Sequence, residues 1–230
     1  MKTTKIDRQP VLGWKLFWVL LGLSVLSLAG HLALYPALPD QVPRQWALDG
    51  SVNSWWGKQQ CLWRWLSPLA LLVLFKVLPA VDPRSDSYRK IRRLWNGFTG
   101  CFMVLYLAFT WMTELYFWGP QAVWQFVPML VVLAIGGGMI ALGNYMPRIR
   151  QNYTMGAKTP WALASEHCWQ RTQRMCGIVF VVDGAGMILA VLADALLGTS
   201  LWAPAAVALL LGGLAWVYLY SWLVYTGKMK

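Results

Sequence analysis

Acidic side chains are scarce in this chain: nine Asp and Glu residues stand among 230, against twenty Lys and Arg. Charged residues make up only 13% of the sequence, whereas hydrophobic residues make up 58% and the mean hydropathy is +0.47. A water-soluble domain of this length needs a far more polar surface. The composition therefore excludes a single soluble globular domain and predicts a chain that lies mostly in lipid.

Motifs of metal sites and enzymes are also missing. The four cysteines form no CxxC pair, and His167, Cys168 and Cys176, which alone cluster like metal ligands, have a spacing that fits no familiar zinc pattern. The sequence contains no HExxH or GxSxG motif, and its apolar segments contain no paired aspartates. We therefore expect no metal, no cofactor and no catalysis, with membrane-embedded hydrolysis as the weakest of the functions considered.

The excess of cations gives a net charge of +11, which in a soluble chain points to nucleic acid as a partner. Here the Lys and Arg residues lie in short stretches between apolar segments, where cations set membrane orientation and contact anionic headgroups. We therefore expect the lipid bilayer as a partner and no direct binding of nucleic acid.

Six apolar segments are long enough to cross a hydrocarbon core of ~30 Å at ~1.5 Å per residue. They cover residues 13–34, 61–80, 96–118, 121–143, 175–197 and 201–225. Backbone amides in lipid must be bonded within their own segment, so each segment should be helical. The first follows a basic head as in a signal peptide, but its apolar run is too long for one, and we interpret it as a retained helix. The sequence thus predicts an all-α membrane protein, a six-helix bundle forming a single membrane domain.

Lys and Arg are distributed unevenly between the two ends of these segments. With the N-terminus in the cytoplasm, seventeen of the twenty cations fall on the cytoplasmic side, and only Arg44, Lys58 and Arg64 fall on the other. Cytoplasmic loops are enriched in these residues, and an odd number of spans would remove the bias. We therefore predict that both termini are cytoplasmic.

Small residues in the last three segments predict close helix packing. Glycine lets helix backbones approach one another in a membrane. The glycines concerned are Gly136, Gly137, Gly138, Gly184, Gly186, Gly212 and Gly213. We expect these three segments to form the tightest part of the bundle.

Residues 35–60 form a long loop that the orientation places outside the cytoplasm. Pro36, Pro39 and Pro43 favour an extended first half, and the pair Asp49-Gly50 is a turn signal. Trp46, Trp55 and Trp56 add apolar mass with polar edges. Two interpretations stay open, a small docking module on the headgroups and a rigid lid that seals the bundle.

Residues 144–174 form a second long loop, on the cytoplasmic side. Thr159 followed by Pro160 predicts a helix start. In the residues after it, apolar and polar side chains fall on different sides of a helix, which predicts an amphipathic helix leading into the fifth span. This helix is either an interfacial element lying in the headgroups or a partner-docking surface. Asn144 and Asn152 are expected to bond loop backbone.

At these two loops the sequence resembles the SdpI family of bacterial membrane proteins. The first loop resembles that family's short N-terminal domain through Leu38, Pro39, Asp40, Val42, Pro43, Trp46, Gly50, Trp56 and Gly57. The second loop resembles the family's other signature through Gly143, Asn144, Tyr145, Met146, Arg150, Asn152, Gly156, Thr159, Pro160, Trp161, Leu163, Trp169, Thr172 and Arg174. One departure is Gln173, because the family often has histidine there.

The resemblance implies a bacterial inner-membrane protein with an immunity or sensing role. The founding member protects its cell from a secreted toxic peptide and recruits a transcriptional repressor to the membrane. By this resemblance, a toxic peptide or other membrane-active ligand would meet Pro39, Asp40, Pro43, Trp46, Gly50, Trp56 and Gly57. A cytoplasmic repressor-type partner would meet Asn144, Asn152, Thr159, Pro160, Trp161, Trp169, Thr172 and Arg174.

Ionisable residues within the spans suggest a second hypothesis. A charge at the bilayer centre costs ~3 kcal/mol or more, so Asp183 is expected either to pair with Lys76 or to be buried protonated as a helix-joining contact. Glu114, His31 and Asp194 lie near outer span ends and are interpreted mainly as solvated edge residues. The alternative function is a transporter or extruder of amphipathic peptides or lipids, working through Glu114, Lys76 and Asp183.

Overall fold

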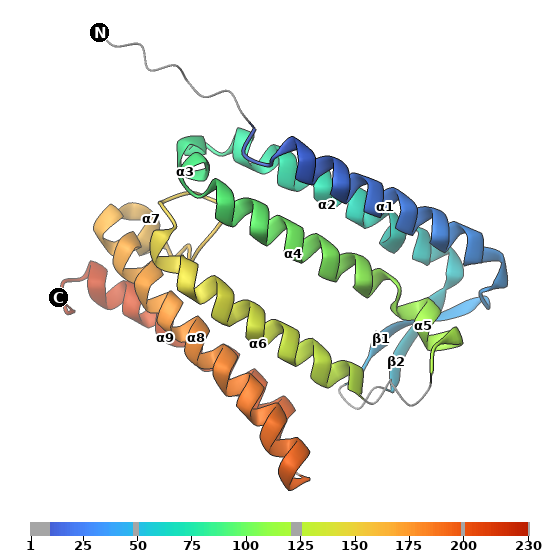
Figure 1. Cartoon of the computed structure of the whole chain (residues 1–230). Coiled ribbons are helices and arrows are strands. Elements are labelled where there is room, and N and C mark those ends of the chain that lie inside the picture. The colour runs from blue at the N-terminus through green and yellow to red at the C-terminus, as the bar shows by residue number, and fades with distance from the viewer. Residues whose placement is uncertain (1–9, 48–50, 121–125, 199–200, 230) are drawn as a thin grey trace. The chain divides into compact units, whose positions relative to one another are not determined.

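The computed structural model describes residues 10–47, 51–120, 126–198 and 201–229, and it is mostly helical (Figure 1). Within these ranges, six helical stretches are long and apolar enough to cross a membrane. Their helices are α1 (Trp14–Leu34), α2 (Cys61–Val81), α4 (Arg92–Thr110) continued by α5 (Met112–Trp118), α6 (Val127–Tyr145), α8 (Glu166–Leu197) and α9 (Trp202–Tyr225). The six expected apolar segments are therefore confirmed as helices over their described residues, and residues 121–125 of the fourth segment lie outside that range. The chain is a multi-pass membrane protein.

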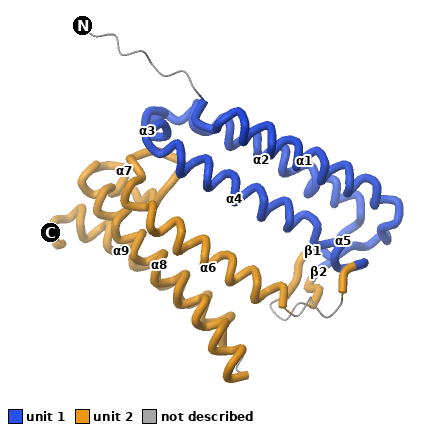
Figure 2. The backbone as a smooth tube through the Cα atoms, in the orientation of Figure 1, with its two compact units in different colours: residues 1–44, 54–118 blue, residues 45–53, 119–230 orange. Residues whose placement is uncertain are grey.

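The chain divides into two compact units, each described here by itself (Figure 2). Unit 1 comprises residues 1–44 and 54–118, and unit 2 comprises residues 45–53 and 119–230. The first three long helical stretches belong to unit 1, and the last three belong to unit 2.

In unit 1, α1, α2 and α4 pack against one another. The short helix α3 (Ser85–Lys90) joins α2 to α4 at one end, and α5 lies at the other end of α4 (Figure 1). Asn96 fastens the start of α1 to α4, because its side chain accepts a hydrogen bond from the Gly13 amide and donates to the carbonyl of Val11, both at 2.8 Å. Trp65, Trp95, Leu72 and Met103 are fully buried in this unit.

Between α1 and α2 the chain forms two short 3-10 helices and a two-stranded sheet. The 3-10 helices are η1 (Tyr35–Ala37) and η2 (Lys58–Gln60), and the strands are β1 (Gln41–Trp46) and β2 (Val52–Gly57). The prolines in the first half of this loop predict extended backbone, and β1, which contains Pro43, is extended. Pro36 instead lies in the 3-10 helix η1, so the expectation is wrong at the start of the loop. The pairing of the two halves into a hairpin is a feature that the sequence analysis did not predict.

In unit 2, α8 packs on α6 through two reciprocal glycine contacts. A Cβ atom added to Gly136 would lie 2.8 Å from the carbonyl oxygen of Gly184, and one added to Gly143 would lie 2.7 Å from that of Gly177. A Cβ atom added to Gly184 or to Gly177 would lie even closer to the carbonyl oxygen of its partner glycine. The glycines are seven residues apart on both helices, so they bring the two backbones into contact twice along one face.

The structure also separates the predicted packing glycines into two groups. Gly136, Gly184, Gly186 and Gly213 face close neighbours, as expected. Gly137, Gly138 and Gly212 have no atom within 4 Å of an added Cβ, so they do not mediate packing in the described structure. Gly143 and Gly177 complete the contact surface and were not among the glycines expected to do so.

These glycine contacts predict a sharp difference between neighbouring alanine variants. Gly136→Ala should lower the free energy of unfolding by about 1–3 kcal/mol, because the new methyl group overlaps the α8 backbone. Gly137→Ala, one residue along the same helix, should leave stability unchanged or raise it slightly. Thermal unfolding of the full chain in detergent, monitored by size-exclusion chromatography of the heated samples, measures the stability of both variants. Equal effects of the two variants would contradict the packing assigned to Gly136.

Candidate functional site

The 144–174 loop folds onto α8 by hydrogen bonds from buried polar side chains. It contains the 3-10 helix η4 (Met146–Arg148) and the short helix α7 (Pro160–Ala164). Thr159 caps α7 by accepting from the Ala162 amide, with Pro160 at the first helical position, which confirms the predicted helix start. The helix breaks at Ser165, whose side chain caps α8, so the expected amphipathic helix consists of α7 and the first turns of α8.

Gln173, on α8, holds the loop with both ends of its amide. Its Oε1 accepts from the Ala157 amide and its Nε2 donates to the Ala157 carbonyl, each at 3.0 Å, and the side chain is fully buried. The neighbouring Gly156 has a φ of +103°, and a Cβ there would lie 2.7 Å from Gln173 Oε1. The sequence marks Gln173 only as a departure from the histidine that is common in the family. It does not predict this pair of hydrogen bonds to Ala157.

Further side chains form hydrogen bonds to the backbone of the loop. Asn152, which is fully buried, accepts from the amides of Thr154 and Met155 and donates to the Arg150 carbonyl, as expected for a residue that bonds loop backbone. Trp169 Nε1 donates to the Ile149 carbonyl at 2.8 Å. Asn144 is exposed and donates to the Ile140 carbonyl within α6.

The same loop is joined to α9 by small polar side chains. The hydroxyl groups of Thr159 and Ser221 form a short hydrogen bond, and Cys168 Sγ donates to the Ser221 carbonyl at 3.4 Å. Thr172 is fully buried beside Cys168, with 3.8 Å between the two side-chain heteroatoms. Five of the eight residues expected to meet a cytoplasmic partner are therefore buried or half-buried: Asn152, Thr159, Trp161, Trp169 and Thr172.

The exposed face of the loop is basic. Pro160 and Arg174 are exposed, together with Asn144, and so are the cations Arg148, Arg150 and Lys158. Trp161 is half-buried, and its ring packs at 71° against that of Tyr218 on α9, with 5.0 Å between the centroids.

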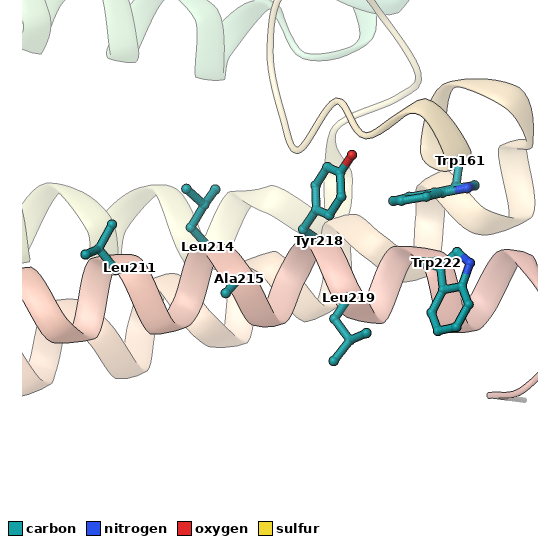
Figure 3. A pocket seen from close by; sticks show the side chains of 7 residues that line it. All are labelled: Trp161, Leu211, Leu214, Ala215, Tyr218, Leu219 and Trp222. Carbon is teal, nitrogen blue, oxygen red and sulfur yellow. The ribbon is translucent and has the colours of Figure 1, made fainter.

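Beside Trp161, α9 carries an open apolar groove of about 730 Å³, shown in Figure 3. Its lining consists of Trp161, Leu211, Leu214, Ala215, Tyr218, Leu219 and Trp222. Large apolar side chains exposed on a membrane helix are typical of a surface in contact with hydrocarbon.

In the part of the 35–60 loop that belongs to unit 1, some of the predicted ligand-binding residues are exposed and others are buried. Pro39 and Asp40 are exposed, whereas Pro43 is buried and Trp56 and Gly57 are half-buried. The Trp56 ring lies between two guanidinium groups, 5.7 Å from that of Arg44 and 5.6 Å from that of Arg64. In unit 2, Trp46 is half-buried, and Gly50 lies outside the described residues.

His31 and Glu114 are buried, which corrects the expectation that they are solvated edge residues. Their exposed fractions are 1% and 3%, and His31 Nδ1 lies 2.7 Å from Glu114 Oε1. Asp194 is also buried, because its carboxylate accepts from the amides of Leu201 and Trp202 at the start of α9. For His31 and Glu114 the partner lies 83 residues away, whereas for Asp194 it is the nearby start of the next helix. In each case a protein group replaces the water that the sequence position suggested.

The other two ionisable side chains within the spans, Lys76 and Asp183, have different neighbours. Lys76 donates to the Leu12 carbonyl at 3.1 Å, and its ammonium lies 3.8 Å from the centroid of the Trp14 ring. Asp183 is buried in α8 beside Gly213, where a Cβ atom would overlap its carboxylate. Since Lys76 and Asp183 belong to different units, their pairing stays a prediction.

Comparison with known proteins gives two matches. Residues 148–221 match the model of the SdpI/YfhL protein family, a stretch that runs from the end of η4 to Ser221 on α9. The chain is also similar to the protein named Immunity protein SdpI from Bacillus subtilis (strain 168), with 26% identity over 167 residues, or 73% of this chain and 76% of that protein. No solved structure matches the chain significantly.

The family match covers most of the folded loop, all of α8 and the Ser221 contact, and the similarity to the immunity protein extends over most of the chain. The family match agrees with the motif read in the second loop, from Arg150 to Arg174. The chain therefore resembles the SdpI/YfhL family of membrane proteins, most clearly at residues 148–221.

Proposed function

We propose that this protein is an immunity protein of the bacterial cytoplasmic membrane, which protects its cell against a toxic peptide or another membrane-active ligand. The similarity to Immunity protein SdpI over 73% of the chain is the observation that carries this proposal. In this proposal the protein protects by binding the ligand.

In this proposal both termini lie in the cytoplasm and the hairpin lies outside it. The cation distribution supports the orientation, since Arg44, Lys58 and Arg64 alone would lie at the outer side. Pro39 and Asp40 then face the extracellular side, where a peptide arrives. Asp40 suits contact with a cationic ligand, because its carboxylate is 94% exposed and its ion pair with Lys58 is long, at 3.5 Å.

The 144–174 loop is proposed to report ligand binding to a cytoplasmic partner. Its buried contacts to α8 and α9 make it part of the membrane helices rather than a free connector. A shift between those helices would therefore change its shape. Its exposed Arg150, Lys158 and Arg174 favour a partner with an acidic surface. A ligand can drive such a change only if it binds two helix arrangements unequally.

Survival of a sensitive bacterium tests the proposal. A strain without its own immunity proteins of this family, expressing this chain, should tolerate the secreted toxic peptide of the founding family member or another peptide from a panel of membrane-active toxins. Replacing the exposed Pro39 and Asp40 with alanine should lower that tolerance about tenfold or more in toxin concentration without lowering the amount of protein, since side chains that contact the ligand are lost.

The matched control is Asp86→Ala, which removes an exposed carboxylate from α3 at the opposite end of unit 1. It should leave tolerance unchanged. The proposal fails if expression of the chain protects against none of the peptides. The role of the hairpin fails if the Pro39 and Asp40 variant protects as well as the natural chain.

A second variant pair tests whether the folded loop is needed. Gln173→Ala should lower the free energy of unfolding by about 1–3 kcal/mol, because it leaves the Ala157 amide and carbonyl without partners. Gln170→Ala, at an exposed position of the same helix, should have little effect. Limited proteolysis between residues 149 and 158 measures opening of the loop directly. Equal cleavage in both variants would contradict the role assigned to Gln173.

A further inference from the structure

A buried polar cluster in unit 1 takes no part in the function proposed above. The His31 ring is stacked between two indoles, with centroids 4.8 Å from Trp65 and 4.2 Å from Trp111. Its two nitrogens contact Glu114 Oε1 at 2.7 Å and Thr110 Oγ1 at 3.1 Å. Charged groups removed from water are costly, so a histidine and a glutamate this deeply buried require a compensating arrangement.

The hydrogen bonds around His31 fix the number of protons in the cluster. The Thr110 hydroxyl donates its only proton to the Leu107 carbonyl at 2.6 Å, so it accepts from His31, and Nε2 therefore carries a hydrogen. The contact of 2.7 Å between Nδ1 and Oε1 joins two acceptors unless one proton lies between them. The pair thus holds one proton beyond a neutral imidazole and a carboxylate, whichever of the two atoms carries it.

The cluster is connected to the hairpin through Arg64. The Arg64 guanidinium donates to Thr113, the residue before Glu114, and lies over the ring of Trp56 on β2. It also contacts Cys61 Sγ at 3.8 Å. The remaining titratable groups around the cluster are Tyr35, whose ring packs on Trp65, and Tyr106 on α4, which is bonded to Ser67.

Glu114 Oε2 and Arg64 Nε are buried and have no hydrogen-bond partner among the described residues. The carboxylate of Glu114 is therefore held by His31 alone, and the contact depends strongly on the proton they share.

We propose that His31 and Glu114 form a proton-binding site that anchors the hairpin to α1 and α5. With one proton between them, the two side chains attract, and α5 holds Arg64 and hence Trp56 in place. Without that proton, the carboxylate faces the lone pair of Nδ1. A second proton would go to the unpartnered Oε2 of Glu114, and Oε1 would still accept from Nδ1–H. Loss of the shared proton therefore breaks the contact of 2.7 Å and loosens the hairpin.

Nitrogen NMR of histidine tests the proton directly, because the chain contains only two histidines and the other, His167, is exposed. The full chain carrying His167→Gln, labelled with 15N-histidine and placed in lipid nanodiscs, reports on His31 alone. Nε2 should carry a proton, and Nδ1 should be shifted from the position of a bare nitrogen by the shared proton. In Glu114→Gln, Nδ1 should become bare while Nε2 is unchanged. A bare Nδ1 or a bare Nε2 in the chain with natural Glu114 would overturn the proposal.

Hydrogen exchange tests the anchor. Glu114→Ala should speed amide exchange of residues 41–44 and 54–57 about tenfold or more, the effect of losing a buried charged hydrogen bond. Asp40→Asn, which removes the exposed ion pair with Lys58, should change it less than about twofold. Equal exchange in the two variants would contradict the anchor. If Glu114→Ala does not fold, the NMR result on Glu114→Gln still decides whether the proton is shared.

Discussion

The structure depends on one constraint, that a polar group surrounded by hydrocarbon must find its partner inside the protein. This constraint makes the spans helical, because their amides bond within the segment. It also explains where the side-chain contacts lie. Asn96 joins the ends of two helices, Asp194 holds the start of α9, and Gln173 closes a loop against α8. Each of these side chains satisfies backbone groups at the end of a helix or in a loop, where the helical hydrogen bonds stop.

Close backbone contact is the second requirement, and it concentrates in unit 2. The glycine pairs between α6 and α8 leave no space for side chains, so these helices are fixed relative to each other along one face. The 144–174 loop begins at the end of α6 and is bonded to α8 and α9. A ligand that changed the packing of these helices would therefore change the loop as well.

The local parts of the fold could be predicted from the sequence. Apolar length identified the six helices, and Thr159 with Pro160 identified the start of α7, because both signals lie within a few neighbouring residues. Helix α8 begins nine residues before the predicted span, since the polar first turns continue the same helix. The break at Trp111, which divides α4 from α5, has no proline or glycine to mark it.

Long-range contacts could not be predicted in the same way. His31 and Glu114 lie near span ends, where water is the ordinary partner, and only their meeting across 83 residues makes them buried. Gln173 has its partner 16 residues earlier, in a loop whose shape depends on Gly156. The resemblance of the two loops to a family indicated which segments carry its signature residues. It did not show which of their residues are exposed and which hold the fold.

The account requires the hairpin and α3 to face opposite sides of the membrane. Short epitope tags inserted after Ser87 and after Gly50 test this in intact cells and in cells with permeabilised membranes. The tag after Gly50 should be accessible to antibody in intact cells, and the tag after Ser87 only after permeabilisation. Access to both tags from the same side would contradict the arrangement, and with it the roles proposed for the two long loops.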